Sequence, residues 1–132
     1  MITISTVRHD YVILGYDLTP YMDEIYTDEW SDNEDNYNRW EVNQNPEEIQ
    51  LFSDPMSGCF LYFGYIVSAK KDYDDDYTVK IDITDDGIDR LSEICDRVND
   101  ALMETGLITE EVEDRIIKDG VPFELICFTE YR

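Results

Sequence analysis

Six acidic residues fall on one side of a predicted helix between residues 85 and 104. Separated by four or three positions along the chain, they are Asp85, Asp89, Glu93, Asp96, Asp100 and Glu104. At about 100° per residue they cover an arc of about 100°. The apolar residues of the segment cover the opposite side, and they are Ile88, Leu91, Ile94, Cys95, Val98, Ala101 and Leu102. The chain must therefore fold so that this helix lies on an apolar layer with its carboxylates in solvent.

These six acids, here called the acidic stripe, recur about once per helical turn, every ~5–6 Å. That interval resembles the spacing of phosphates along a nucleic-acid strand. Like charges at this spacing destabilise a helix by about 0.2–0.5 kcal/mol per pair. Two arginines on the flank are expected to relieve part of the repulsion through the pairs Asp86–Arg90, Glu93–Arg97 and Arg97–Asp100. The alternative interpretation is an ordinary solvated helix face in an acidic protein.

Composition sets the class of partner. The 132 residues are 42% hydrophobic, which predicts a single domain over residues 1–132 with a real core. The net charge of -22 far exceeds the magnitude of about 2–8 that keeps a small domain soluble. Such an excess repels itself, so we expect the protein to use it. Its sign excludes direct binding of nucleic acid or of an anionic membrane and favours a basic protein, while the oligomeric state stays open.

Cysteine usage and the absence of apolar runs predict a cytoplasmic protein. No stretch approaches the ~20 apolar residues of a membrane helix, and the N-terminus lacks the pattern of a secretory signal. The three cysteines, Cys59, Cys95 and Cys127, lie in apolar strand or helix patterns. We therefore expect buried, reduced thiols.

Periodicity and capping residues predict the elements. Strands are expected at 2–7, 10–17, 59–69, 77–83 and 121–131, with 59–83 forming a hairpin. Helices are expected from Thr19 to about Trp30, from Thr84 to near Gly106, and from Glu110 to Lys118. We expect an acidic loop at 31–38, an edge strand or helical turn at 46–52 and a turn at 54–58. The order indicates an α+β fold, a mostly antiparallel sheet of about four strands with two to three helices packed on one face.

Two further acidic segments could extend the stripe. One lies in the turn of the predicted hairpin and contains Asp74, Asp75 and Asp76, although a solubilising turn is the alternative interpretation. The other, here called the first acidic segment, contains Asp23, Glu24, Asp28, Glu29, Asp32, Glu34 and Asp35. Aromatic residues interleave with these acids and are either interface anchors or core residues, namely Tyr21, Tyr26, Trp30, Tyr37, Trp40, Tyr73 and Tyr77.

Metal and catalytic sites fail on their spacing rules. Residues 72–76 place aspartates at the first three ligand positions of an EF-hand loop. However, Tyr77 stands where glycine is needed and Ile83 where a bidentate glutamate is needed. The single histidine, His9, excludes a multi-histidine metal site. No nucleophile motif and no glycine-rich phosphate loop occurs. We therefore expect no enzyme, no metal and no cofactor.

A small, strongly acidic α+β chain with carboxylates in helical rows resembles the DNA-mimic inhibitors of phages and mobile elements. This class includes anti-restriction and anti-CRISPR proteins. The acidic stripe, Asp74 to Asp76 and the first acidic segment carry the resemblance, which is one of character over the whole chain. It implies that carboxylates stand in for phosphates in the channel of a basic nucleic-acid-binding protein. A phage-defence nuclease in the cytoplasm of a bacterial host cell is the implied target.

Two other functions fit the same charge. The chain could be an immunity protein that neutralises a basic nuclease toxin, in which case a toxin gene would lie beside its own. It could also be an acidic binding or assembly module that holds a basic partner without blocking it, and the partner would then be recovered active.

Overall fold

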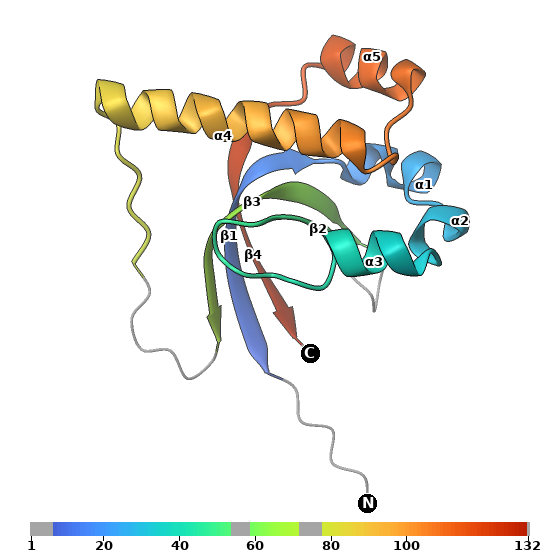
Figure 1. The fold of residues 1–132 in the computed structure, drawn as a ribbon, viewed down its shortest axis with the longest axis horizontal. Coiled ribbons are helices and arrows are strands. Elements are labelled where there is room, and N and C mark those ends of the chain that lie inside the picture. Colours follow the sequence, from blue (N-terminus) through green and yellow to red (C-terminus); the bar gives the residue numbers. More distant parts are fainter. Residues whose placement is uncertain (1–6, 54–58, 72–77, 132) are drawn as a thin grey trace, which may run out of the picture.

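The computed structural model describes residues 7–53, 59–71 and 78–131. Four antiparallel strands form one sheet in the order β2-β3-β1-β4 (Figure 1), namely β1 Arg8–Asp17, β2 Ile49–Ser53, β3 Leu61–Lys71 and β4 Glu124–Tyr131. Within these residues the helices are η1 Thr19–Tyr21, α1 Met22–Ile25, α2 Asp28–Ser31, α3 Glu34–Trp40, α4 Asp85–Glu104 and α5 Glu110–Asp119. The α+β class and the antiparallel sheet of four strands are thus confirmed.

Strand β1 lies in the middle of the sheet and pairs with β3 on one side and β4 on the other. Strand β3 in turn pairs with β1 and with β2, so both of its edges are occupied. The predicted hairpin over 59–83 is therefore wrong, because β3 has no free edge for a following strand. Residues 78–83 instead lead to α4 without joining the sheet. The ambiguous segment at 46–52 supplies the edge strand β2.

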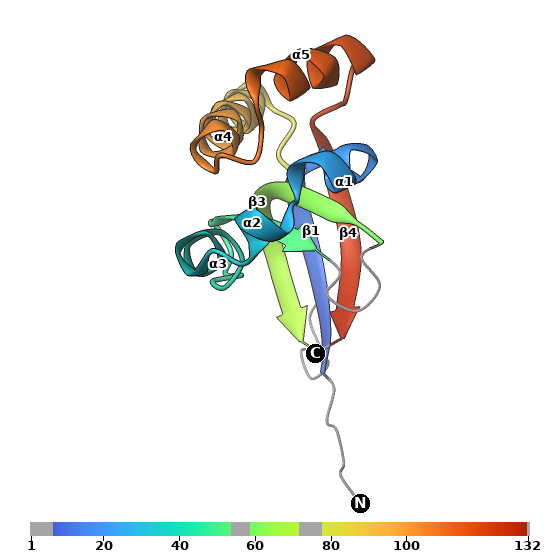
Figure 2. The ribbon, with the colours of Figure 1, turned by 90° about the vertical axis from the view of Figure 1, so that its right-hand side faces the viewer.

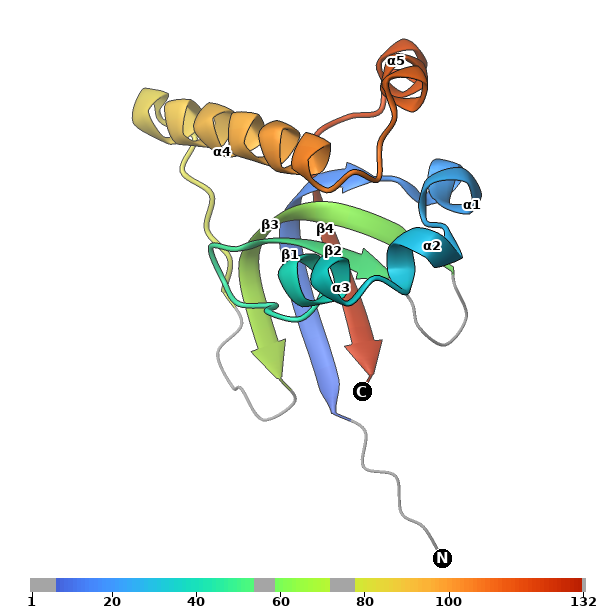
Figure 3. The same ribbon diagram turned by 45° about the vertical axis from the view of Figure 1, so that its right-hand side comes forward.

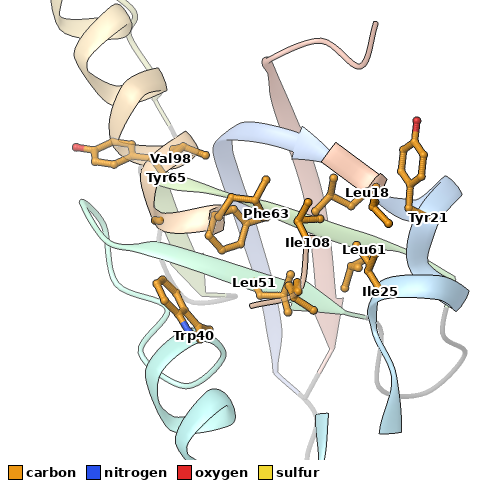
Figure 4. Packing of buried hydrophobic residues seen from close by; sticks show 14 of the residues in the cluster. Leu18, Tyr21, Ile25, Trp40, Leu51, Leu61, Phe63, Tyr65, Val98 and Ile108 are labelled. Carbon is orange, nitrogen blue, oxygen red and sulfur yellow. The ribbon is translucent and has the colours of Figure 1, made fainter. Parts of the chain in front are cut away.

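The helices pack on one face of the sheet, as expected, although they are more numerous than the two to three expected. One cluster joins the sheet to a buried residue of each α-helix, among them Ile25, Trp30, Trp40, Val98 and Val112. Figure 4 shows part of this cluster, in which Phe63 and Leu51 of the sheet lie among side chains from several helices. All five α-helices therefore contribute to the core on this face.

The opposite face carries an aromatic cluster to which no described helix contributes. Phe52 of the edge strand β2 and Phe128 of the other edge strand, β4, lie with ring centroids 5.0 Å apart. In a flat sheet these strands would be separated by three intervals of about 4.8 Å each. The sheet therefore curls toward this face, and the aromatic rings fill the inside of the curl.

A cross-strand pair of glycines lies in the middle of the curled sheet. Gly15 of β1 pairs with Gly64 of β3. A Cβ on Gly15 would lie 2.0 Å from the carbonyl oxygen of Phe63, and a Cβ on Gly64 would lie 2.5 Å from that of Leu14. The two backbones therefore approach too closely for any side chain at this point.

The predicted helix from Thr19 to Trp30 is broken into three short pieces. Tyr26 leaves the helical region, with ψ at 70°, and the hydroxyl of Thr27 then accepts a hydrogen bond from the amide of Trp30 to start α2. The predicted loop at 31–38 likewise contains most of α3, because the side chain of Asn33 caps the amides of Asp35 and Asn36. These breaks allow both tryptophans to reach the core, which a straight helix followed by a loop would not.

The thiols are less buried than expected. Cys59 and Cys127 are exposed and Cys95 is half-buried, and all three are free. The expectation of burial failed for Cys127 because the helix layer does not cover its face of β4. In the described part of the chain, no helix combines the length and the apolar character needed to cross a bilayer. The strand expected at 2–7 and the turn expected at 54–58 lie largely or wholly outside the described residues.

Candidate functional site

Helix α4 presents the acidic stripe. Its start is fixed by Thr84, whose hydroxyl accepts a hydrogen bond from the amide of Gly87 at 3.3 Å. The carboxylate of Asp82 accepts from the amide of Thr84 at 2.9 Å and holds the residue before the helix. Ile94 and Val98 lie on the buried side, opposite the stripe. Over 20 residues the stripe extends for about 28 Å along the helix axis.

The stripe carboxylates are directed to solvent. All six residues are exposed. Glu104 forms an ion pair with Arg39 of α3, with a nitrogen–oxygen distance of 2.9 Å. Among the described residues, the other five form no ion pair and no side-chain hydrogen bond. Five carboxylates thus remain available to a partner.

The flanking arginines do not neutralise the stripe as expected. Within the described parts of the chain, neither Arg90 nor Arg97 forms an ion pair, so the three expected pairs are absent. The guanidinium carbon of Arg97 instead lies 5.7 Å from the centre of the Tyr65 ring on β3. The helix turns this flank toward the sheet, where Arg97 lies over an aromatic face. The repulsion along the stripe is therefore less relieved than the sequence suggested.

The first acidic segment meets the C-terminal end of α4. The indole nitrogen of Trp30 donates a buried hydrogen bond of 2.8 Å to the carbonyl oxygen of Thr105, the residue after the helix. Arg39 of α3 reaches Glu104, the last acid of the stripe. Figure 3 shows α1, α2 and α3 near this end of α4. The two acidic regions therefore belong to one continuous helical layer.

All seven acids of the first acidic segment are exposed. Six of them occupy the first turns of α1, α2 and α3, and they are Asp23, Glu24, Asp28, Glu29, Glu34 and Asp35. Carboxylates are stabilising there because a helix N-terminus carries partial positive charge. Glu24 also pairs with Arg115 of α5, and this guanidinium lowers the pKa of the carboxyl below its ordinary value. This segment thus has a structural explanation that the acidic stripe lacks.

The remaining residues of the predicted site are outside the described residues, buried in the core, half-buried or exposed. Asp74, Asp75 and Asp76 lie outside the described residues, as do Tyr73 and Tyr77. Of the remaining aromatic candidates, Tyr21, Trp30 and Trp40 are core residues, Tyr26 is half-buried and Tyr37 is 52% exposed. Sequence reasoning missed Arg39. The signal that could have identified it is its position as the first basic residue after His9, following the entire first acidic segment.

A cleft of about 650 Å³ opens beside the N-terminal half of α4. Its apolar wall includes Leu14, Tyr65 and Leu91, and charges of both signs surround it, including Arg90 and Asp86. Within the described residues, no three His, Cys, Asp or Glu side chains are grouped to hold a metal ion. The cleft offers apolar surface next to the stripe rather than a convergent set of catalytic groups.

One half-buried carboxyl lies apart from these surfaces. Glu41, at the end of α3, accepts hydrogen bonds from Tyr26 Oη at 2.9 Å and from Ser53 Oγ at 3.4 Å. Burial raises the pKa of this carboxyl, and the two hydroxyl donors partly offset the rise. The group links the helix layer to the end of β2.

Comparison of the chain with protein families, with curated proteins and with solved structures finds no match.

Proposed function

We propose that the protein is an acidic inhibitor that mimics nucleic-acid phosphates. It would occupy the DNA-binding channel of a phage-defence nuclease, a CRISPR effector or a restriction enzyme, in the cytoplasm of a bacterial host cell. The inhibitor itself performs no catalysis. It acts in proportion to its amount, by excluding the nuclease's true ligand.

The acidic stripe carries this proposal. A surface helix ordinarily mixes both signs on its exposed face, and pairs of opposite charge there stabilise it. On α4, five exposed carboxylates without ion pairs among the described residues follow one side of the helix from Asp85 to Asp100. Their spacing of about one per turn suits cationic side chains arranged to hold a phosphate backbone. The net charge of -22 extends the attraction beyond direct contact.

Binding by this route has a characteristic dependence on salt. Long-range attraction accelerates the encounter of oppositely charged surfaces, and added salt screens it. We expect the association rate with the target nuclease to fall steeply between 0.05 and 0.5 M NaCl, conditions over which the Debye length shrinks from about 14 to about 4 Å. An affinity that is unchanged over this range would contradict phosphate mimicry.

A neutralised stripe provides the direct test. The variant carries Asp89→Asn, Glu93→Gln, Asp96→Asn and Asp100→Asn. We expect at least a hundredfold loss of inhibition of a target nuclease in a DNA-cleavage assay. The folded variant keeps its buried face, because all four replaced side chains are exposed.

A second variant distinguishes the effect of the acidic stripe from the effect of net charge. It neutralises four exposed acids elsewhere, Glu47, Glu48, Glu110 and Asp114, and so has the same net charge as the stripe variant. We expect it to inhibit within about threefold of the unmodified protein, since only the general attraction is weakened. Equal losses in the two variants would show that net charge acts without the stripe.

Neutralisation of a basic nuclease toxin is the second candidate, and the same unpaired carboxylates favour it. A toxin gene adjacent to the gene for this chain would favour that function over inhibition of a defence nuclease. A role as an assembly module would be favoured if the bound partner were recovered with its activity intact.

A further inference from the structure

Strand β4 forms an open edge of the sheet. It pairs with β1 on one side, and among the described strands it has no partner on the other. Figure 2 shows β4 running along one side of the sheet with no helix laid over its length. Within the described residues no strand pairs with this outer edge, so its backbone groups could accept a further strand.

The side chains of β4 make this edge unusual. None of its eight residues is buried, whereas three of the five residues of the other edge strand, β2, are buried. Leu125 is 43% exposed, Tyr131 is 64% exposed, and Cys127 between them is exposed on the same face. On the other face Ile126 and Phe128 are half-buried against the aromatic cluster. An exposed, apolar edge strand of this length is a favourable template for pairing.

The negative charge of the protein determines which kind of strand can bind the outer edge of β4. The two ionisable carboxylates of β4 are Glu124 and Glu130, near its ends, and the whole chain carries -22. A second copy of the chain would bring an equal negative charge to the edge and be repelled. A strand rich in lysine or arginine would be attracted by the same field, and its apolar residues could cover Leu125 and Tyr131.

We propose that β4 binds an extended, basic strand of a partner protein, which extends the sheet by one strand. Main-chain hydrogen bonds along the outer edge would supply affinity, and alternating apolar and cationic side chains would supply selectivity. This edge belongs to the sheet rather than to the acidic stripe, so the proposal does not depend on phosphate mimicry.

Cys127 provides a built-in reporter for the test. The probe is an eight-residue peptide of alternating lysine and valine that carries one cysteine activated as a pyridyl disulfide. The control peptide replaces lysine with glutamate. Mass spectrometry measures the labelling of each thiol by each peptide. We expect the ratio of basic-peptide to acidic-peptide labelling to be at least tenfold higher at Cys127 than at exposed Cys59. Equal ratios at the two thiols would show general attraction only and would overturn the proposal.

Two variants test the backbone pairing. In an antiparallel strand, neighbouring amides point to opposite edges, so one of Leu125→Pro and Ile126→Pro removes an outward N–H. The variant that keeps the unfolding temperature of the unmodified protein identifies that position. We expect it to lose the Cys127 preference and the slowed hydrogen exchange of β4 that the basic peptide causes. Retention of both would overturn the proposal. So would a dimer in sedimentation at 0.5 M NaCl that this variant abolishes, since the occupant would then be a second copy.

Discussion

At the scale of single residues, exposure and pairing have different origins. The exposure of the six stripe acids followed from spacing alone, because one face of α4 had to be apolar. The partners of the nearby arginines did not follow from spacing. Arg97 lies over Tyr65, and Arg39 joins Glu104, and both contacts link residues far apart in the chain. The sequence predicts which face of a helix is charged, but which cation reaches which anion depends on the packing of other elements.

Glu41 should make the stability of the protein depend on pH. Its folded-state pKa lies above its ordinary value of 4.5, so the folded protein holds this proton more tightly than the unfolded chain. The native state is therefore favoured at low pH, and the ionised carboxyl opposes folding as pH rises above about 4.5 through the folded-state pKa. We expect Glu41→Gln to gain stability relative to the unmodified protein over that rise, measured by urea unfolding from pH 4 to pH 8.

The control for Glu41 is Glu48→Gln, where the carboxylate is exposed and lies outside the helices. Its stability difference from the unmodified protein should vary less over this pH range. A difference for Glu41→Gln that stayed constant from pH 4 to pH 8 would contradict a role for burial of this carboxyl.

At the scale of elements, capping residues and apolar periodicity predict a helix or strand correctly where its own residues determine its structure. The cap at Thr84 and the apolar period gave α4 within two residues of its end. The same reasoning failed for residues 19–30, where burial of Trp30 against Thr105 required a break. It also failed for residues 78–83, whose alternating pattern suits a strand but finds both edges of β3 occupied. Strand pairing is a long-range property, so alternation alone predicts a strand and not its neighbour.

The glycine pair in the curled sheet gives a prediction at this scale. Gly15→Ala would place a Cβ 2.0 Å from a backbone oxygen, which no rotation of a side chain can relieve. We expect a loss of about 3 kcal/mol or more in the free energy of unfolding, at or above the upper end for overpacked sites. Denaturant unfolding measures this directly.

Gly106→Ala is the comparison for Gly15→Ala. Its φ is +73° and nothing lies within 4 Å of the position where the Cβ would stand. The cost is then the left-handed backbone alone, about 1–2 kcal/mol. A loss for Gly15→Ala no larger than this would show that the two strands can separate locally without harm.

At the scale of the whole molecule, repulsion among the carboxylates destabilises the folded state. The described residues contain three ion pairs, Arg8–Asp10, Arg39–Glu104 and Arg115–Glu24, against a net charge of -22. The remaining carboxylates repel one another through solvent, and salt screens that repulsion. Screening should therefore stabilise the free protein while it weakens binding to a basic partner.

We expect the thermal unfolding midpoint to rise by several degrees between 0.02 and 0.5 M NaCl. A change of 1 kcal/mol shifts the midpoint of a domain of this size by about 4 °C. The variant with four neutralised stripe acids should begin from a higher midpoint and rise less. Calorimetry of the two proteins across the salt series measures both effects, and a flat response in the unmodified chain would contradict them.

Both tryptophans of the chain, Trp30 and Trp40, lie buried in the helix layer, and the aromatic rings of the cluster on the opposite face are those of phenylalanine and tyrosine only. Intrinsic fluorescence excited at the red edge of the absorption band, where indole alone absorbs, will therefore report on one side of the sheet only. The indole of Trp30 is tethered to the end of α4, so its emission maximum should shift to longer wavelength when that helix lifts away. A change confined to the aromatic cluster would leave this emission unaltered, because no tryptophan lies on that face.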